Sequence, residues 1–242
     1  KILEKNPHKK NEAIPNRNIK CNLKAYQFAN FISVASQHVK ESFLLHQYPE
    51  NRIFVNPYGV DLSMFKPLPN IPKKYDVIMV GGWGYEKGCD LIVEAIRKTN
   101  YSFIHVGSIK DVDFPQEKNF THIDPVDQSK LIEYYNQAKV FILPSRQDGF
   151  GMVLSQALAC NLPIIGSNNC GAPDLKKMVE LPEYITIIKD YTADAIVTAI
   201  HTAIKNYEQL GERIYAGNAI ENLTWEAYGK RYANFLHKII KQ

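Results

Sequence analysis

The chain has 242 residues, of which 45% are hydrophobic and 22% are charged, a composition typical of globular proteins and not of disordered ones. No apolar run reaches the roughly 18–20 residues needed to span a bilayer, and the basic N-terminus lacks the apolar segment of a signal peptide. The net charge of +4 is too small and too scattered to indicate nucleic-acid binding. We therefore expect a soluble, cytoplasmic protein.

The first part of the chain contains short elements followed by a proline-rich segment. A helix-like segment, an apolar run, a helix and a short strand are predicted at 22–29, 31–34, 36–46 and 52–55. Ser36 is placed as the N-cap of its helix. Three prolines then occur between residues 67 and 72. Because proline interrupts both helix and strand, we place an interdomain linker at about 65–74.

From Tyr75 onward, strands and helices alternate. The strands are near-continuous apolar runs, as in a parallel sheet covered on both faces, and are predicted at 77–81, 103–107, 120–123, 140–144, 164–167 and 185–188. Helices are predicted between most of them, at 88–98, 128–138, 152–159 and 174–179. This alternation predicts an α/β fold, a Rossmann-like doubly wound parallel sheet with helices on both faces. Such a sheet binds ligands at the carboxyl ends of its strands.

The C-terminal part, 194–242, is predicted to be helical. Its last helix begins at Thr224 and carries a stripe of aromatic and apolar residues at three- and four-residue spacing, namely Trp225, Tyr228, Tyr232, Phe235 and Ile239. A stripe of this kind needs a packing partner. Either the core of the same domain or a second domain can supply it.

The loop at 81–88 has the chemistry of a phosphate site. Gly81 and Gly82 permit close approach of a ligand, and the helix that follows directs N–H groups and partial positive charge at it. Lys87 adds a full positive charge. The spacing does not fit a Walker A loop. Taken alone, the loop is equally compatible with an ordinary strand–helix turn.

The loop at 144–151 leads directly into a predicted helix. Gly149 and Gly151 flank the helix start, leaving its first N–H groups available to an anion. Asp148 lies beside that start and Gln156 lies eight residues later. Two such side chains can hold the sugar and the ribose of a nucleotide sugar, whereas a helix cap and a surface amide are the plainer alternative. A third loop, 168–174, either closes over a ligand or simply connects strand to helix.

No metal site is expected. Asp111 and Asp113 resemble a metal-binding Asp-x-Asp, but carboxylate sites need further oxygen ligands, so we expect a solvated turn. His105 lies on an apolar strand and is expected to be a hydrogen-bonded core residue. Free thiols are expected for the four cysteines, which show neither a CxxC pair nor a histidine at metal spacing: Cys21, Cys89, Cys160 and Cys170.

Four motifs in register resemble glycosyltransferase family 4, the glycosyl transferases group 1, which has GT-B architecture. They lie at 31–36 with 39–43, at 56–61 with 65–67, at 80–81 with 87–88, and at 144–145 with 148–151. The resemblance covers nearly the whole chain. It is specific for the family but not for a substrate.

The resemblance implies a retaining, metal-independent hexosyltransferase with two Rossmann-like domains, the C-terminal one holding most of the donor. Lys87 would bind the diphosphate. Asp148, the catalytic position, would face the sugar hydroxyls as the first residue of the family's Glu-x7-Glu motif, and Gln156 would face the ribose as the second. The remaining donor contacts would be Gly81, Gly82, Asp124 in the base-selecting loop, Ser145, Arg146, Gly149, Phe150, Gly151, Met152 and Val153.

The implied partners follow from the same resemblance. No cofactor is expected, and a UDP- or GDP-linked sugar would be the co-substrate. The acceptor would be a glycan or a lipid-linked molecule used in surface polysaccharide assembly. A lipid-linked acceptor would place the protein at the inner face of the membrane.

Three positions depart from the family pattern. Asp148 is one methylene shorter than glutamate, and Gln156 replaces a charged ribose contact by a neutral, weaker one. Gly82 stands where the family usually has an arginine, so one of two diphosphate cations is missing. Arg146, in the neighbouring loop, is our candidate replacement.

The domain organisation is also implied by the family. We expect residues 1–74 to be the end of an acceptor-binding N-terminal domain plus the linker, 75–222 the nucleotide-sugar-binding domain, and 223–242 a helix packing back towards the N-terminal domain. The rest of the acceptor domain would precede Lys1. The chain alone is then expected to bind donor but to transfer sugar weakly.

Two other functions remain open. A non-catalytic nucleotide-sugar-binding module is compatible with Gly82 and Gln156. Another GT-B enzyme, such as a sugar-nucleotide epimerase, is disfavoured by the motifs at 57–61 and 65–67. A dehydrogenase is poorly supported, because no strand is followed by G-x-G-x-x-G and an acidic residue about 20 positions later.

Overall fold

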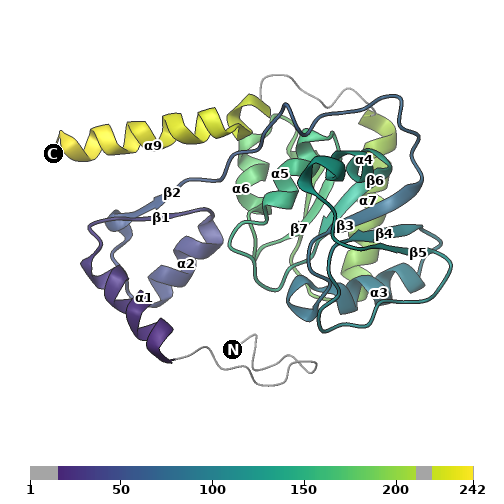
Figure 1. Cartoon of the computed structure of the whole chain (residues 1–242), viewed down its shortest axis with the longest axis horizontal. Coiled ribbons are helices and arrows are strands. Elements are labelled where there is room, and N and C mark those ends of the chain that lie inside the picture. The colour runs from purple at the N-terminus through teal and green to yellow at the C-terminus, as the bar shows by residue number, and fades with distance from the viewer. Residues whose placement is uncertain (1–15, 211–219, 242) are drawn as a thin grey trace.

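The computed structural model describes residues 16–210 and 220–241, which form a large and a small parallel sheet (Figure 1). The large sheet has the strand order β5-β4-β3-β6-β7-β8, and its neighbouring strands are parallel. Its strands are β3 (Tyr75–Val80), β4 (Phe103–Val106), β5 (Phe120–Ile123), β6 (Ala138–Leu143), β7 (Ile164–Ser167) and β8 (Ile185–Ile188). The predicted Rossmann-like α/β fold is confirmed.

The strands follow the apolar runs of the sequence closely. Predicted and observed bounds agree for β5, β7 and β8. The two central strands begin two residues earlier than predicted, because Tyr75 of β3 pairs with Ala138 of β6. Their central residues, such as Ile78 and Phe141, have no exposed surface. The core of the molecule therefore lies on both faces of β3 and β6.

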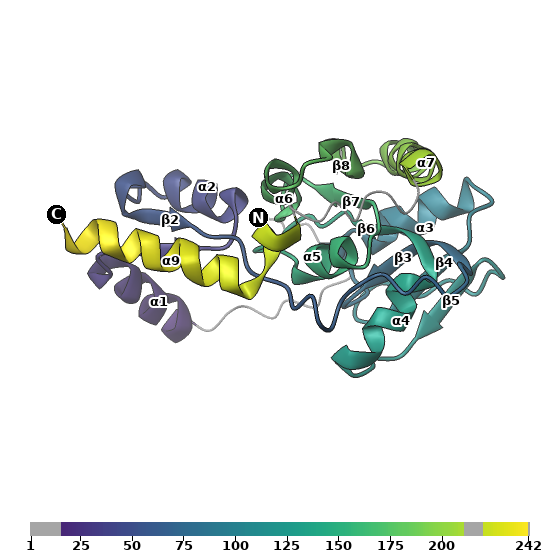
Figure 2. The same cartoon turned by 90° about the horizontal axis from the view of Figure 1, so that it is seen from above.

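Helices cover both faces of the large sheet (Figure 2). On one face α3 (Cys89–Arg97) packs against α7 (Ala193–Leu210), and on the other lie α4 (Leu131–Asn136) and α5 (Met152–Ala159). This placement follows from right-handed crossovers that leave β3 in opposite directions. The fifth helix, α6 (Ala172–Met178), contacts β7 and β8.

Two helices differ in extent from their predictions. The segment predicted as one helix at 128–138 forms a 3-10 turn, Gln128–Lys130, followed by the short α4. It ends early because Ala138 is already part of β6. By contrast, α6 begins two residues before the predicted Asp174, since Pro173 fits the first turn of a helix, where its missing N–H is not needed.

The small sheet pairs β1 (Ile32–Val34) with β2 (Ile53–Val55) and is flanked by α1 (Asn16–Phe28) and α2 (Gln37–Leu45). The long C-terminal helix α9 (Trp225–Ile240) lies along it in both views (Figures 1 and 2). Phe235 of α9 stacks on Phe54, with ring centroids 4.0 Å apart, and meets the edge of Phe31. The aromatic stripe of the last helix thus packs on residues that are distant in sequence.

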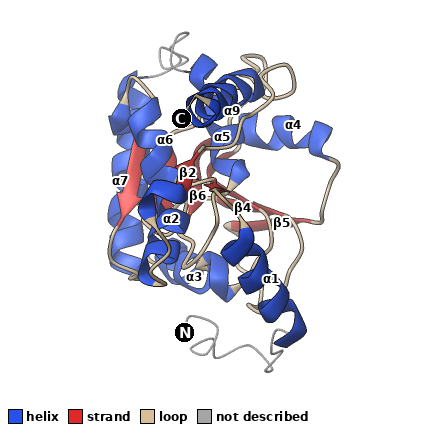
Figure 3. Ribbon diagram, turned by 90° about the vertical axis from the view of Figure 1, so that its left-hand side faces the viewer, coloured by secondary structure: helices blue, strands red, loops and turns tan. Residues whose placement is uncertain are grey.

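The segment 65–74 contains no helix or strand, as its prolines predict. It is nevertheless anchored to the large sheet. Phe65 is buried against Tyr135, and the side chain of Asn136 hydrogen-bonds the backbone of Lys66 and Leu68. The loops at the carboxyl end of the large sheet face α1 and α2, which lie on the side turned towards the viewer in Figure 3.

The structure can be compared with the sequence predictions for the cysteines and for membrane-spanning segments. All four cysteines are free, as predicted; Cys21 is exposed, and burial raises the pKa of the Cys89, Cys160 and Cys170 thiols. Within 16–210 and 220–241, no helix has the length and apolar character needed to cross a membrane. Residues 1–15 and 211–219, which belong to the predicted first and second domains, lie outside the described residues.

Candidate functional site

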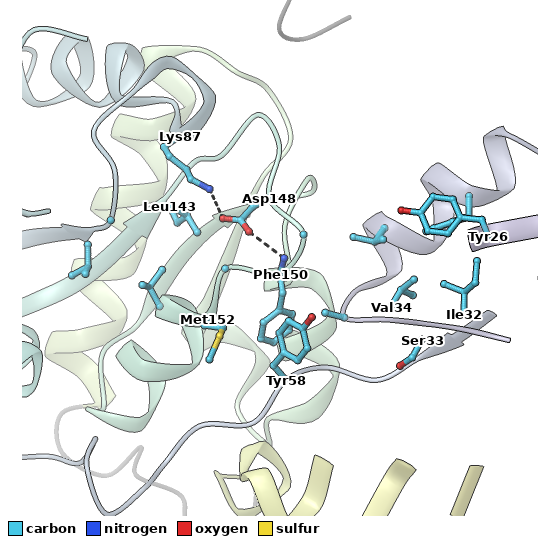
Figure 4. A pocket seen from close by; sticks show the side chains of 18 residues that line it. Tyr26, Ile32, Ser33, Val34, Tyr58, Lys87, Leu143, Asp148, Phe150 and Met152 are labelled. Atoms are coloured by element: carbon cyan, nitrogen blue, oxygen red, sulfur yellow. Dashed lines mark hydrogen bonds and ion pairs between the residues drawn. The ribbon is translucent and has the colours of Figure 1, made fainter. Parts of the chain in front are cut away.

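A cavity of about 610 Å³ lies between the large sheet and the small sheet (Figure 4). The loops after β3 and β6 and the start of α5 form one wall, and β1, α2 and Tyr58 form the other. The first wall contains most of the predicted donor contacts: Gly81, Lys87, Asp148, Gly149, Phe150, Gly151, Met152 and Val153. The cavity therefore lies at the carboxyl ends of the strands, where a doubly wound sheet binds its ligand.

Lys87 and Asp148 form an ion pair in this cavity. Lys87 Nζ lies 2.6 Å from Asp148 Oδ2, with the side chains 23% and 18% exposed. The lysine ends the 3-10 turn Tyr85–Lys87 after β3, and the aspartate lies in the loop after the adjacent strand β6. The other carboxylate oxygen accepts the N–H of Phe150 at 3.1 Å. These are the charged side chains of the cavity lining, so together they leave it electrically neutral.

The start of α5 is directed at the same place. Gly151 has a φ of +77°, and a Cβ at this position would lie 2.8 Å from Leu143 Cδ2. Glycine is therefore required both for the left-handed backbone and for the space. Met152 and Val153, the first residues of α5, line the cavity. Since the first N–H groups of a helix lack intrahelical partners and carry partial positive charge, this end favours an anion beside Lys87.

The start of α2 is hydrogen-bonded to the loop that carries Asp148 and to α6. Ser36 Oγ accepts the N–H of Val39, which confirms the predicted N-cap, and donates its own proton to the Gly149 carbonyl at 2.6 Å. The N–H of Gln37 is 3.1 Å from both carboxylate oxygens of Asp174. We call Ser36, Gln37, Gly149 and Asp174 the clasp. It joins residues more than 100 positions apart, which is why the local sequence pattern did not predict it.

Gln156 lies in a neighbouring part of the site. Its side chain is buried, and its Oε1 accepts a hydrogen bond from the buried Tyr135 hydroxyl at 2.9 Å. This bond fixes the orientation of the amide. Gln156 also lines a cavity of about 200 Å³ together with Gln128, Met152 and Trp225. The amide is thus neither a surface group nor exposed to bulk solvent, in contrast to the plainer alternative considered from the sequence.

Arg146 is held by residues of the loop and helix that follow β3. Its guanidinium makes two hydrogen bonds with the carboxylate of Asp90, at 2.6 and 2.7 Å, and a third with the Tyr85 carbonyl. It also lies over the Tyr85 ring, 3.7 Å from the centroid. A bidentate, stacked arginine is costly to release. Arg146 therefore joins the two loops, and its role as a replacement cation stays a prediction.

Three further predicted contacts do not line the cavity. Ser145 is fully buried beneath the loop, and its carbonyl accepts hydrogen bonds from Ser167 and Tyr191. A direct ligand contact by Ser145 stays a prediction. The side chain of Asp124 is 96% exposed and lies 3.4 Å from His122 Nε2. The contact of Asp124 with the base stays a prediction. The donor contact of Gly82, which follows the cavity-lining Gly81, also stays a prediction.

His105 is a hydrogen-bonded core residue, as predicted. Its Nε2 is 2.8 Å from the Gly81 carbonyl and its Nδ1 is 2.9 Å from His122 Nδ1. Since a carbonyl only accepts, His105 Nε2 carries the proton and Nδ1 accepts from His122. Burial lowers the pKa of His105 to about 4. The neutral imidazole therefore holds the carbonyl of a glycine that lines the cavity.

Asp111, in the Asp111–Asp113 segment, contacts the loop after β3. Asp111 Oδ1 accepts the N–H of Tyr85 at 2.9 Å, so this carboxylate helps to hold the loop after β3. Among the described residues, no group of three histidine, cysteine, aspartate or glutamate side chains could hold a metal ion. The segment expected to be a solvated turn thus also contacts the loop after β3.

Phe150 was predicted to line the site, whereas the other aromatic residues of the cavity, Tyr26, Phe43 and Tyr58, were not. Tyr58 points towards Phe150, with ring centroids 5.6 Å apart, and both are labelled in Figure 4. On the opposite wall Tyr26 and Phe43 meet edge to face at 5.0 Å. The turn that contains Tyr58 was singled out only as a family motif. Its cavity position depends on how the small sheet packs, which no local pattern reveals.

Comparison with known proteins gives a consistent result. Residues 63–219 match the family described as glycosyl transferases group 1. The chain is 26% identical, over 88% of its length and 56% of the relative's, to a probable sucrose-phosphate synthase of Thermosipho melanesiensis. It is 23% identical, over 86% of its length and 62% of the relative's, to a GDP-mannose-dependent alpha-(1-6)-phosphatidylinositol monomannoside mannosyltransferase of Mycolicibacterium smegmatis.

A solved structure shares the fold. HepE of Anabaena in complex with UDP-glucose superposes with a TM-score of 0.70 and 16% identity, over 93% of this chain and 68% of that one. At this identity the likeness concerns the fold alone. The chain spans little more than half the length of the first curated relative it matches.

Proposed function

The chain belongs to the glycosyl transferases group 1, and from this premise we propose that it supplies the donor site of a retaining hexosyltransferase. The donor is a nucleoside-diphosphate sugar. The observation that carries the proposal is the Lys87–Asp148 ion pair at the start of α5. It places a cation, a carboxylate and a helix N-terminus together in one cavity.

An incoming diphosphate can take the place of Asp148 beside Lys87, because the charge-assisted contact of the lysine with the carboxylate is exchanged for one with a phosphate oxygen. The N-terminus of α5 adds N–H donors on the same side. Preorganised positive charge of this kind stabilises the leaving diphosphate as its bond to the sugar breaks. Lys87 therefore serves first as a partner of Asp148 and then as a partner of the donor.

Asp148, once released, becomes an acceptor for sugar hydroxyls. It is the catalytic residue of the proposal, because its carboxylate touches the reacting sugar. The new glycosidic bond forms on the face from which the diphosphate departs, so the configuration is retained. Gln156, oriented by Tyr135, is proposed to donate its amide to the ribose. Relatives that use GDP-mannose or bind UDP-glucose make UDP and GDP the bases to test.

The acceptor is proposed to be a glycan or a lipid-linked molecule that approaches past α1 and α2. A cavity of about 420 Å³ lies there and shares Asp148 and Gly149 with the donor cavity. Much of its wall is apolar, with Leu23, Tyr26 and Phe43, and His38 adds a polar group. This position supports an acceptor that reaches the sugar from the small-sheet side.

Metal independence is part of the proposal. Part of the positive charge that a divalent cation provides in other transferases is supplied here by Lys87 and the start of α5. Neither cofactor nor metal is then required for donor binding. EDTA should leave the affinity unchanged.

Calorimetric titration with UDP, GDP and their glucose and mannose conjugates tests the proposal. We expect saturable binding of one nucleotide, weakened about tenfold or more by Lys87→Ala because a charge-assisted contact is lost, and unaffected by EDTA. Lys98→Ala is the matched control, since this exposed lysine pairs with Asp194 far from the cavity. If Lys87→Ala and Lys98→Ala bind equally well, the donor-site assignment is wrong. A chain that binds the donor sugar but never releases or transfers it would instead be a binding module.

A further inference from the structure

The proposed donor site is short of positive charge. Each phosphate of a diphosphate carries negative charge, yet the cavity lining offers Lys87, which is already paired with Asp148. Arg146 is held by Asp90. A further cation at this edge of the sheet would balance the ligand. The loop after β4 provides one.

The loop after β4 is joined to the loop after β3 by backbone hydrogen bonds. The N–H of Trp83 donates to the Ser108 carbonyl at 2.8 Å, and the N–H of Lys110 donates to the Trp83 carbonyl at 2.9 Å. A Cβ at Gly107 would overlap the Gly81 carbonyl oxygen, so glycine is needed for this close approach. The backbone of Lys110 is thus fixed beside the residues that line the cavity.

The side chain of Lys110 lies over Gly82. A Cβ at Gly82 would collide with Lys110 Cε and would lie 2.8 Å from its Nζ. The ammonium group therefore lies where a side chain of residue 82 would begin, one residue after the cavity-lining Gly81. Lys110 is exposed, and no ion pair joins it to another residue within 16–210 or 220–241. Its charge is available to a ligand.

We propose that Lys110 is a second donor-binding cation, delivered to the diphosphate from the loop after β4 through the space left by glycine at position 82. The inference rests on the proposed function, because it assigns a contact to the same donor. It also gives Gly82 a role. The residue must lack a side chain so that the lysine of the neighbouring loop can lie over it.

The test compares the affinities of the diphosphate, UDP or GDP, with those of its nucleoside, uridine or guanosine, by calorimetry at low ionic strength. Lys110→Ala should weaken diphosphate binding about tenfold, the loss expected for one charge-assisted contact, and leave nucleoside binding unchanged. Lys110→Arg should restore most of the affinity. Lys118→Ala is the matched control, an exposed lysine of the same β4–β5 connection.

Gly82→Ala tests the position of the lysine without removing its charge. The φ of Gly82 lies outside the left-handed range, so alanine fits the backbone, but its methyl group must displace the end of the Lys110 side chain. We expect weaker diphosphate binding, and the double variant with Lys110→Ala should be no weaker than the single lysine variant. A lysine that only lies on the surface would move aside, and Gly82→Ala would then bind normally.

The outcomes separate the two proposals. If the unmodified chain binds UDP or GDP and Lys110→Ala binds it as tightly as Lys118→Ala does, the role of Lys110 is refuted and the donor site stands. If the unmodified chain binds neither nucleotide, both the proposed function and the role of Lys110 are overturned.

Discussion

The two sheets of this protein differ in how they are held together. The central strands of the large sheet are buried on both faces, and its helices pack directly on it. The small sheet has two strands of three residues, and every residue of β2 keeps partial exposure. Aromatic residues of α9 pack on Phe54 of β2, and α2 contacts both strands. Hydrophobic burial therefore stabilises the large sheet by itself, whereas the small one depends on a few contacts.

The two sheets also contribute different groups to the cavity. The large sheet positions Lys87, Asp148 and the start of α5, the groups proposed to hold a diphosphate. The small sheet and the start of α2 contribute an apolar and aromatic wall and the clasp residues Ser36 and Gln37. The proposed donor groups thus lie on the more deeply buried sheet, and the opposite wall lies on the less buried one. This arrangement suits an enzyme that must admit a donor and an acceptor in turn.

The largest expected effect is on the core of the large sheet. Phe141→Ala should lower the free energy of unfolding by about 3–5 kcal/mol, because it empties a fully buried site. Phe54→Ala, in the partly buried small sheet, should cost about half as much. Urea unfolding followed by circular dichroism measures both. Leu45→Ala, which alters an exposed side chain, should change stability by less than about 0.5 kcal/mol. Equal losses at Phe141 and Phe54 would remove the distinction between the two sheets.

A second prediction concerns the pH dependence of the donor side. The folded-state pKa of His105 is about 4, against about 6.5 in the unfolded chain. As the pH falls below about 6.5, the unfolded chain binds a proton that the folded chain does not. Stability is therefore lost as the pH falls from about 6.5 to 4, by about 3 kcal/mol in total.

Thermal unfolding measured at several pH values between about 7.5 and about 5 follows this loss, because the range includes the unfolded pKa of about 6.5. The groups facing His105 are His122 and the Gly81 carbonyl, with Asp124 beyond His122. His105→Asn removes the titrating group, so the melting temperature of this variant should fall less steeply over the same range. Identical slopes would show that His105 does not control the pH response.

The smallest expected effect is at the clasp. Ser36→Ala removes the N-cap of α2 and the hydrogen bond to Gly149, which should cost about 1 kcal/mol of stability. Because the loop of Asp148 loses one support, we also expect donor affinity to fall by about two- to fourfold. Thr198→Ala, which removes an exposed hydroxyl on α7, is the control. Unchanged donor affinity in Ser36→Ala would show that the small sheet does not help to position the donor.

The sequence predicted the large sheet well because its strands are apolar runs separated by clear turn signals. The bounds of β7 and α5 agree with the prediction, since Pro163 and Gly151 mark where each begins. Lys87 and Asp148 were correctly placed together, because loops that follow adjacent parallel strands meet at one edge. For these elements, local pattern and tertiary structure agree.

The contacts that were not predicted concern side chains whose partners are distant in sequence. Arg146 was expected to face the ligand, and its pairing with Asp90, 56 positions away, gave no local signal. Lys110 carried no signal, because an exposed lysine in a loop is ordinary until the packing of two loops places it over Gly82. The clasp was missed for the same reason. Such contacts follow from the packing of whole elements and not from periodicity.

The most direct test of the central claim is the structure of this chain bound to UDP or GDP, whichever it binds in solution. The account predicts that Lys87 Nζ leaves Asp148 Oδ2, now 2.6 Å away, and lies about 3 Å from a diphosphate oxygen. The diphosphate should also face the first N–H groups of α5. A nucleotide bound elsewhere, with the Lys87–Asp148 pair intact, would contradict the account.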